Sequence, residues 1–424
     1  HCILFYRLGD FYEMFFDDAK LVAKELELTL TGRGCGQEER APMCGMPYHS
    51  CDGYIARLIA NGHKVCVCEQ VEDPKSAKGL VKREVVKVIT PGTVTDSDML
   101  DSAKNNFLAA LMLKYETAAL CFADVSTGEL FLTCITDFTE QDIINELCKF
   151  TPSEILITSE GLAFKEVTAY CSQRLSALVS TFEDSFDMNE ISQQILRHFK
   201  AATLSELDIE NEAELSALYA VLSYIVGTQK GDIGYINKLE VYSKAQFMEL
   251  DLSTRRNLEI TESMRHGTKQ GSLLNVLDRT KTSMGSRKLR TMLERPLIKV
   301  NDINKRLSAV EELKLRAIER DRLTDCLKSI HDLERLMTRL MLGSGNAKDL
   351  IAFKNAFEVL PKIKQSLSGF QSKLLKTLDS NIIEQNELYN IIENSIIDNP
   401  PFTVKEGGII KDGYDSSVDE NRHL

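Results

Sequence analysis

The spacing of apolar residues changes near Asp251, and this change limits the folds open to the chain. Before it, from residue 3 to about residue 226, short runs of β-forming residues alternate with helical stretches. After it, apolar residues recur at helical spacing, as in Ile303, Leu307, Val310 and Leu313, then Leu333, Leu336 and Leu340, then Leu350, Phe353 and Phe357. A chain of 424 residues is too long for one hydrophobic core, so about three domains are expected. The sequence predicts a multidomain protein, mixed α/β at first and all-α afterwards.

The first α/β segment covers residues 1–92 and ends at Pro91-Gly92. Strands are expected at residues 3–7, with an extended continuation to Glu13, and at 64–69 and 85–89. Helices are expected at residues 18–25, with Asp17 as N-cap, and at 54–59, opened by Ser50 or Asp52. A flexible loop is expected at residues 32–36. Residues 93–105 contain a polar stretch and are expected to be a linker.

A second α/β segment follows at residues 106–230. Strands are expected at residues 107–113, 118–125, 129–134 and 154–158, with a hairpin turn at 126–128, a helix near 138–149 and further helices to about 226. Residues 231–399 are expected to be helical until Asn399-Pro400-Pro401 ends them. A short tail punctuated by glycines occupies residues 400–424.

The charge distribution excludes a generic nucleic-acid binder, which would carry a basic surplus. The formal net charge is −12, and residues 1–95 hold 12 lysines and arginines against 13 acids, a net of −1. Residues 251–300 are the basic exception, with 11 against 5, a net of +6. Any duplex binding should therefore depend on distortion of the duplex more than on release of counterions.

Composition also places the chain in a reducing compartment. The 11 cysteines are odd in number and scattered, which is typical of reduced thiols in a cytosolic protein. No apolar run approaches the length that spans a membrane, and no leader-like segment is evident. We therefore expect a cytoplasmic protein without membrane contact. The first residue is His1 and not a methionine, so we expect that the ends have been cut.

One short segment carries a specific chemical suggestion. Gly9-Asp10 precedes Phe11 and Glu13, which are two residues apart and would point to the same side of an extended strand. An aromatic ring can enter a base step from the minor groove and kink it, while a neighbouring acid meets an exposed base edge. This pair would suit a test of whether a base pair is weakly stacked. Asp10 and Tyr12 are expected to be structural.

Several motifs place this segment in a wider context. They are GDFYEMFFDDA at residues 9–19, PMCGMPYHS at 42–50, TPGT at 90–93, STRRNLEIT at 253–261 and SMGSRKLR at 283–290. Together they resemble the MutS family of DNA mismatch-repair proteins, and the resemblance runs from the first residues to the last.

The resemblance implies a role for each segment. Residues 1–92 would be the mismatch-recognition domain, residues 93–105 a linker and residues 106–230 a connector with a ribonuclease-H-like fold. Residues 231–399 would form the first half of the helical core and lever, and residues 400–424 the start of the clamp. Phe11 would be the wedge that enters the mispair, and Glu13 its acidic partner. The implied function is recognition of mispaired or unpaired bases and small loops in double-stranded DNA.

The resemblance also implies features that lie outside this chain. No Gly-x4-Gly-Lys-[Ser/Thr] phosphate loop occurs, and the most similar string, at residues 267–272, lacks the lysine before the serine. The family's ATPase module, which uses ATP and Mg²⁺, lies beyond the clamp. We therefore expect the N-terminal part of a longer bacterial, nucleoid-associated protein, not itself an enzyme and without a cofactor or metal of its own. Family members act as homodimers with a MutL-type partner, so this part alone should bind mismatched DNA poorly.

Basic residues give weaker candidates for contacts with the DNA backbone or minor groove. Arg83 and Lys82, with Lys87, either meet phosphates beside the wedge or are solvated strand charges; Arg33 and Arg57 are further candidates. Residues 43–48 are expected to pack beneath the wedge, with direct contact of Pro47 and Tyr48 with DNA as the alternative. The basic residues Arg255, Arg256, Arg287, Lys288 and Arg290 either touch DNA or tie helices together, and the structural role is favoured.

Other functions remain as alternatives. Cys44, His49, Cys51, His63, Cys66 and Cys68 invite a zinc site, but their spacings are unusual, and alternation would put Cys66 and Cys68 on one buried strand face. Asp124 and Glu129 suggest a metal-dependent nuclease as another alternative, although two-metal cleavage needs further converging carboxylates. Two further alternatives are a MutS relative that binds branched DNA and a scaffold without a DNA role. Such relatives generally lack the wedge segment, so Phe11 and Glu13 argue against a protein that binds branched DNA.

Overall fold

The computed structural model describes residues 2–34, 36, 39–72, 81–183, 187–243 and 246–423. The chain divides into two compact units. The first contains His1–Leu100 and Asn106–Ser243, and the second contains Asp101–Asn105 and Lys244–Leu424. The first unit is mixed α/β and the second is helical, as the sequence predicts.

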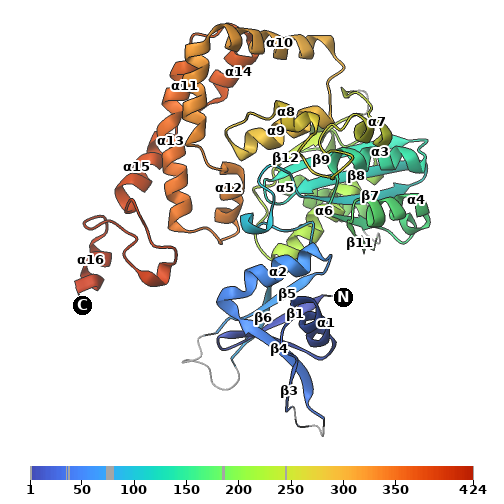
Figure 1. The fold of residues 1–424 in the computed structure, drawn as a ribbon, viewed down its shortest axis with the longest axis vertical. Coiled ribbons are helices and arrows are strands. Elements are labelled where there is room, and N and C mark those ends of the chain that lie inside the picture. The colour runs from blue at the N-terminus through green and yellow to red at the C-terminus, as the bar shows by residue number, and fades with distance from the viewer. Residues whose placement is uncertain are drawn as a thin grey trace. The chain divides into compact units, whose positions relative to one another are not determined.

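A six-stranded sheet forms the N-terminal part of the first unit (Figure 1). Its strands lie in the order β3-β4-β2-β1-β5-β6, and only β1 and β5 pair in parallel. The strands are β1 (Ile3–Leu8), β2 (Phe11–Phe15), β3 (Thr31–Arg33), β4 (Ala41–Pro47), β5 (Val65–Gln70) and β6 (Arg83–Ile89). The strands predicted at 64–69 and 85–89 are confirmed as β5 and β6.

Two helices, α1 (Phe16–Leu26) and α2 (Cys51–Ala60), pack on one face of this sheet. Their apolar residues join Ile3, Phe5 and Met14 in a buried core. The opposite face of β1 and β2 stays open to solvent, because every second side chain of each strand points away from the core. The open face therefore presents its own row of side chains.

Two local predictions in this part were wrong. Asp17 does not cap the first helix, which begins one residue earlier; Asp17 and Asp18 lie in its first turn, and Asp18 accepts a hydrogen bond of 2.9 Å from the Leu4 amide. The loop expected at residues 32–36 is in part a strand, since β3 pairs with β4 through residue 33. In both cases pairing with distant residues outweighs local propensity.

A second six-stranded sheet follows, in the order β11-β10-β7-β8-β9-β12. Neighbours β7, β8 and β9 are antiparallel, while the β7–β10, β10–β11 and β9–β12 pairs are parallel. The strands are β7 (Phe107–Lys114), β8 (Thr117–Asp124), β9 (Glu129–Thr136), β10 (Glu154–Ile157), β11 (Leu178–Thr181) and β12 (Lys238–Val241). The sequence predicted the first four of these strands and missed β11 and β12, which have four residues each.

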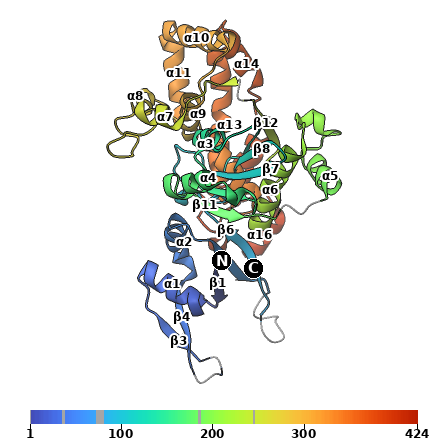
Figure 2. The same ribbon diagram turned by 90° about the vertical axis from the view of Figure 1, so that its right-hand side faces the viewer.

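Helices cover both faces of the second sheet. Figure 2 shows α3 (Glu140–Phe150) and α4 (Lys165–Ala169) on one side and α5 (Met188–Phe199) and α6 (Glu212–Gln229) on the other. On the α3 side, the Phe150 ring stacks on Phe122 with centroids 3.9 Å apart. The six consecutive buried residues of β7 are typical of a strand enclosed on both faces.

A buried carboxylate joins the two sheets. Glu154, at the start of β10, is fully buried and receives donors from the turn at residues 90–93, from Lys64 directly before β5, and from the second sheet and its helices. The donors are Thr90 Oγ1, the Gly92 amide at 3.2 Å, Ser180 Oγ at 2.8 Å, Tyr224 Oη at 2.7 Å and Lys64 Nζ at 3.3 Å. Both carboxylate oxygens therefore have hydrogen-bond partners, and removing the carboxylate would leave several buried donors at this junction unpaired.

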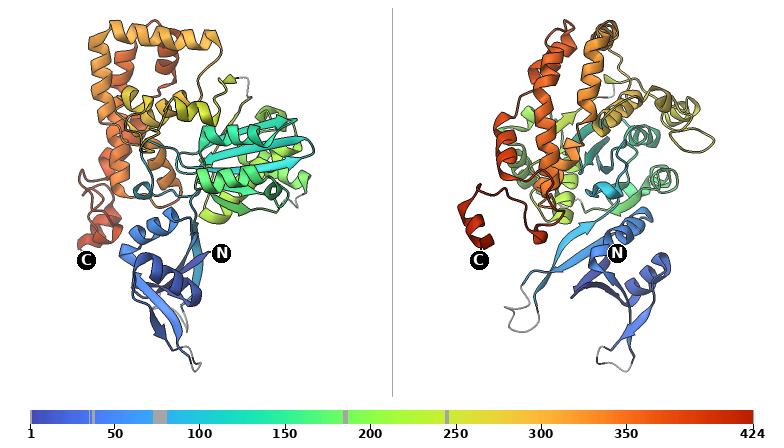
Figure 3. Two further views of the ribbon diagram at one scale, coloured as in Figure 1. Left: turned by 45° about the vertical axis from the view of Figure 1, so that its right-hand side comes forward. Right: turned by 60° about the vertical axis from the view of Figure 1, so that its left-hand side comes forward.

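The second unit is a set of packed helices. Figure 3 shows α11 and α13 running side by side. The helices are α7 (Leu252–Asn257), α8 (Leu273–Leu277), α9 (Ser283–Glu294), α10 (Val300–Leu315), α11 (Ala317–Lys328), α12 (Leu333–Met341), α13 (Ala347–Leu367), α14 (Lys373–Asn381), α15 (Asn386–Ser395) and α16 (Ser416–His423). The predicted helical spacings at residues 303–313, 333–340 and 350–357 are confirmed in α10, α12 and α13.

Candidate nucleic-acid interface

The open face of β2 is built by a tight reversal of the chain. β1 and β2 are antiparallel, with Leu8 opposite Phe11, so Gly9 and Asp10 form a two-residue turn. Gly9 has a φ of 61°, which glycine adopts without steric cost. The extended segment predicted to run on from residue 7 is therefore interrupted, and Phe11 begins a new strand.

Alternation along β2 then separates its side chains. Tyr12 and Met14 are buried in the core, whereas Phe11 and Glu13 lie on the open face. Phe11 is 46% exposed, a high value for a large apolar ring. The prediction that Phe11 and Glu13 share one side of a strand is confirmed, and so is the structural role of Tyr12.

Residues behind the turn hold it in place. The Arg7 guanidinium lies 3.6 Å from the centroid of the Tyr48 ring and donates a hydrogen bond to the Gly9 carbonyl oxygen. The Tyr48 amide donates to the Asp10 carbonyl oxygen at 3.0 Å, and Pro47 pairs with Phe11 in register. Pro47 and Tyr48 therefore support the turn and the start of β2, while their packing beneath the Phe11 ring and their contact with DNA stay predictions.

A second set of contacts, on the buried side of β2, holds the Tyr12 hydroxyl in position. Its hydroxyl donates to the Glu69 carboxylate, which also accepts from Arg7 at 3.4 Å. Burial, with the Glu69 hydrogen bond, raises the pKa of Tyr12 and keeps the phenol neutral. Sequence reasoning missed Arg7 and Glu69; the only available signal was a charged residue at the end of each of two apolar strands.

Glu13 is paired with a cation from a neighbouring hairpin. Its Oε2 contacts the guanidinium of Arg33 at the end of β3, and the Glu13 side chain is 17% exposed. Strand β4 lies between β2 and β3 and places Gly45 directly opposite Glu13. A Cβ at Gly45 would lie 3.4 Å from Glu13 Cγ and 3.1 Å from the Tyr12 carbonyl oxygen. The missing side chain leaves space for Glu13.

The other predicted basic residues do not gather beside Phe11. Arg83 donates to the carbonyl oxygens of Arg7 at 2.8 Å and Val81 at 2.9 Å. Arg57 donates to the Glu25 carbonyl oxygen at 3.1 Å. Each guanidinium therefore has a structural role, and their contacts with DNA stay a prediction.

Two lysines of the same region differ in exposure. The side chain of Lys82 is 67% exposed and pairs with Glu84 at 2.5 Å. Lys87 donates to Thr95 Oγ1 at 3.0 Å, and burial lowers the pKa of its ammonium group. Lys82 is the more accessible of the two to a phosphate.

The cysteines and histidines that the structure describes are not grouped as metal ligands. Within the described ranges, no group of three or more His, Cys, Asp and Glu side chains is placed to hold a metal ion. The expected common face for Cys66 and Cys68 was wrong, since a β-bulge between Val67 and Cys68 interrupts the alternation. Cys68 is buried, whereas Cys66 is only half-buried. Burial raises the pKa of Cys44 to about 11, which suits a reduced thiol in the core.

The acids of the nuclease alternative serve a turn. Asp124 is fully buried and accepts hydrogen bonds from Ser126 N at 2.9 Å, Ser126 Oγ at 2.7 Å and Asn106 N at 3.1 Å. Glu129 pairs with Asp124 in register across β8 and β9. These contacts close the hairpin turn predicted at residues 126–128 and do not favour a nuclease.

The basic segment of the second unit is mainly structural. Arg287 is buried and donates to the Asp332 carboxylate at 2.6 and 2.8 Å, to Glu334 at 2.6 Å and to the Ser102 carbonyl oxygen at 3.1 Å. Arg255 donates to the Leu250 carbonyl oxygen at 3.0 Å, and Arg290 pairs with Glu294 at 3.4 Å. The favoured interpretation is confirmed for these three; Arg256 and Lys288 are exposed.

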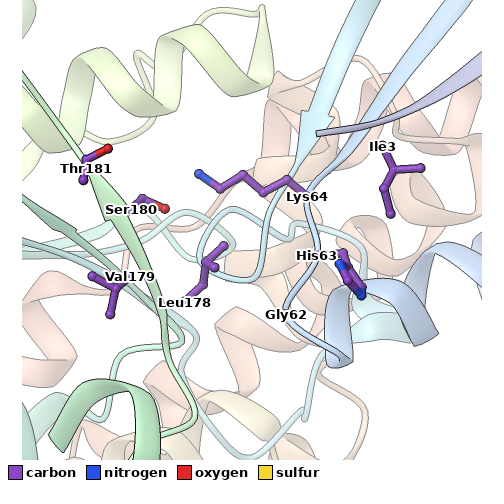
Figure 4. Close-up of a pocket in the computed structure, with 8 residues that line it drawn as sticks. All are labelled: Ile3, Gly62, His63, Lys64, Leu178, Val179, Ser180 and Thr181. Carbon is purple, nitrogen blue, oxygen red and sulfur yellow. The ribbon is translucent and has the colours of Figure 1, made fainter. Parts of the chain in front are cut away.

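A cavity of about 310 Å³ lies away from the predicted site residues. It is lined by Ile3, residues 62–64 and strand β11 (Figure 4). The Lys64 side chain extends toward Ser180 there, and its ammonium group also contacts Tyr224 Oη at 3.0 Å. These groups already take part in the Glu154 junction, so the cavity belongs to that junction.

Comparisons with known proteins agree with the geometry. Three family models match: MutS domain I at residues 1–98, MutS domain II at residues 106–237 and MutS domain III at residues 253–422. A protein named DNA mismatch repair protein MutS from Ruminiclostridium cellulolyticum is 50% identical over 425 residues, covering 99% of this chain and 48% of the relative. Proteins of the same name are 46% identical in Acetivibrio thermocellus and 45% in Lachnoclostridium phytofermentans, each over 99% of this chain and covering 48% and 45% of the relative.

The chain spans about half the length of the curated relatives it matches. A search of the described helices finds none with the length and apolar character needed to cross a bilayer.

Proposed function

The chain belongs to the MutS family of DNA mismatch-repair proteins, and from that premise we propose that it recognises mispaired or unpaired bases in double-stranded DNA. One observation carries the proposal: Phe11 stands half-exposed beside Glu13 on the open face of β2, at the end of a braced turn. Phe11 is the wedge, and Glu13 meets the base edge that the wedge exposes.

The physical basis is a difference in the cost of unstacking. An aromatic ring stacked on a base gains roughly 1–3 kcal/mol, while opening a well-stacked step costs a few kcal/mol. A correctly paired step therefore resists the ring, whereas a mispair opens more easily. The Gly9 turn and the Arg7–Tyr48 contact reduce the freedom of Phe11 before binding, so less entropy is lost in the complex.

The roles of the other parts follow from the same family. The order β11-β10-β7-β8-β9, with β8 antiparallel to both neighbours, supports a ribonuclease-H-like connector at residues 106–230. Residues 238–241 form β12 of the connector sheet, so the first half of the core and lever begins after residue 243, not at residue 231 as the sequence suggested. It continues to residue 399, and residues 400–424 begin the clamp. The whole protein is a homodimeric ATPase that uses ATP and Mg²⁺ and works with a MutL-type partner in the cytoplasm, near the nucleoid.

The test compares Phe11→Ala with Phe16→Ala in the full-length protein. Phe16 is a suitable control because it is an aromatic residue of the same part of the fold and is 61% exposed. Binding to matched and mismatched duplexes is measured by fluorescence anisotropy at one stated salt concentration. We expect Phe11→Ala to weaken mismatch binding by about ten-fold or more, which corresponds to the loss of one stacking contact.

The control should bind both duplexes as the wild type does. Equal weakening of both duplexes by Phe11→Ala would contradict the proposal, since Phe11 would then support the fold or contact DNA without discrimination. Thermal unfolding of each variant separates these two explanations.

A further inference from the structure

We infer that Arg33 determines mismatch specificity by holding the Glu13 carboxylate in position, an inference that rests on the function proposed above. Arg33 lies at the end of β3, separated from Glu13 by strand β4, and its guanidinium contacts Glu13 Oε2. This contact gives Arg33 a different role from that of a simple phosphate ligand.

The pair leaves one oxygen of Glu13 free. Oε2 is occupied by Arg33, whereas Oε1 accepts no hydrogen bond from any residue that the structure describes. Glu13 shares the open face with Phe11, so Oε1 is available to a donor on a base edge beside the wedge. Arg33 thus fixes the carboxylate through Oε2 and leaves Oε1 available to accept a hydrogen bond from the base.

Arg33 also reduces the electrostatic cost of this position. A bare carboxylate beside DNA phosphates is repelled by like charge, and the repulsion grows where water is excluded. A guanidinium in contact with the carboxylate offsets that charge and restricts its rotamers. Without Arg33, the Glu13 side chain would rotate freely and Oε1 would no longer be held toward the base edge beside the wedge, so binding to mismatched duplex would weaken more than binding to matched duplex.

The sheet provides the space that this pair requires. Gly45 stands opposite Glu13 on β4, and a Cβ there would lie 3.4 Å from Glu13 Cγ and 3.1 Å from a backbone oxygen. That spacing is tighter than an ordinary contact at the backbone oxygen, so Glu13 or β2 would have to shift. A side chain at residue 45 should therefore disturb the pair while leaving both charges in place.

The test is a double-mutant cycle in the full-length protein. The variants are Arg33→Gln, Glu13→Gln and the double variant, and the measured quantity is the ratio of Kd for matched duplex to Kd for mismatched duplex. We expect Arg33→Gln to lower this ratio about three- to five-fold in the wild-type background, the size of an exposed ion-pair effect. In the Glu13→Gln background the same change should leave the ratio within about two-fold.

Two further variants guard against a trivial result. Arg33→Lys should restore part of the ratio, because it returns the charge without the planar fork. Lys20→Gln is the matched control: Lys20 forms an exposed ion pair with Asp17 at 3.0 Å on α1, and its loss removes one positive charge without touching Glu13. This control should leave the ratio unchanged in both backgrounds.

Each outcome decides between distinct possibilities. Equal effects of Arg33→Gln in both backgrounds would overturn the inference and make Arg33 a phosphate contact. An unchanged ratio with weaker binding to both duplexes would also overturn it. If Arg33→Gln fails to fold, as judged by thermal unfolding, Gly45→Ala replaces it, and a ratio that stays at the wild-type value then overturns the inference. A wild-type ratio near one would instead overturn the proposed function itself.

Discussion

The two sheets of the first unit differ in how many of their faces are covered. The second sheet has helices on both faces, and its charged residues Asp124 and Glu154 are buried with their oxygens accepting hydrogen bonds. The first sheet has helices on one face, and its other face presents Phe11 and the Glu13–Arg33 pair to solvent. Side chains of the same chemical kind thus stabilise the fold in one sheet and are available for binding in the other.

Replacing a phenylalanine in each sheet should show the largest difference. Phe122→Ala removes a fully buried ring that stacks on Phe150 at 3.9 Å, and should lower the free energy of unfolding by about 3–5 kcal/mol. Phe11→Ala should lower it by less than about 1 kcal/mol, because its ring is half-exposed. Urea denaturation measures both values, and similar losses would show that the first sheet also depends on Phe11 for stability.

Neutralising one carboxylate in each sheet is expected to have a smaller effect. Glu154→Gln leaves Lys64 without a carboxylate partner and weakens several hydrogen bonds, so a loss of about 2–3 kcal/mol is expected. Glu13→Gln should cost less than about 1 kcal/mol, because its partner Arg33 is 50% exposed. The same denaturation series checks both. A loss at Glu13 that matched the loss at Glu154 would remove the contrast between the two sheets.

Thiol chemistry can test whether the covered face of the first sheet is as closed as its core residues suggest. Burial raises the pKa of the Cys44 thiol from its ordinary value of 9.0 to about 11. Since the thiolate is the reactive form, Cys44 should react with iodoacetamide at pH 8 about 100-fold more slowly than an unperturbed thiol. Peptide mapping after timed labelling gives the rate, and fast labelling in the folded state would indicate that α1 opens.

A substitution at the first residue of α1 gives the smallest expected change. Phe16 has a φ of 55° and an exposed side chain, and a left-handed conformation costs a bulky residue about 1–2 kcal/mol. Phe16→Gly should remove this cost. Glycine also raises the conformational entropy of the unfolded chain, which offsets part of the gain, so the net stabilisation should be about 0.5 kcal/mol. A thermal unfolding midpoint below that of the wild type would contradict this estimate and would point to a packing role for the ring.

The sequence was informative where local periodicity decides the outcome. The i, i+2 spacing of Phe11 and Glu13 identified a shared strand face, and the apolar runs at residues 107–134 identified three strands. It failed where distant partners decide. The Glu13–Arg33 pair depends on the order β3-β4-β2, and the internal role of Arg83 depends on the Arg7 carbonyl oxygen. Strands β11 and β12 are too short to show alternation and form through pairing with β10 and β9.

The position of Glu154 has a consequence for how this part of the protein melts. The turn at residues 90–93 ends the N-terminal sheet and donates to a carboxylate that belongs to the other sheet. Neither sheet can lose its structure without exposing that carboxylate or its donors, so the two are expected to unfold together. Calorimetry of this region should then show a single heat-absorption peak, and cutting the backbone between the sheets should lower the temperature of that peak for both.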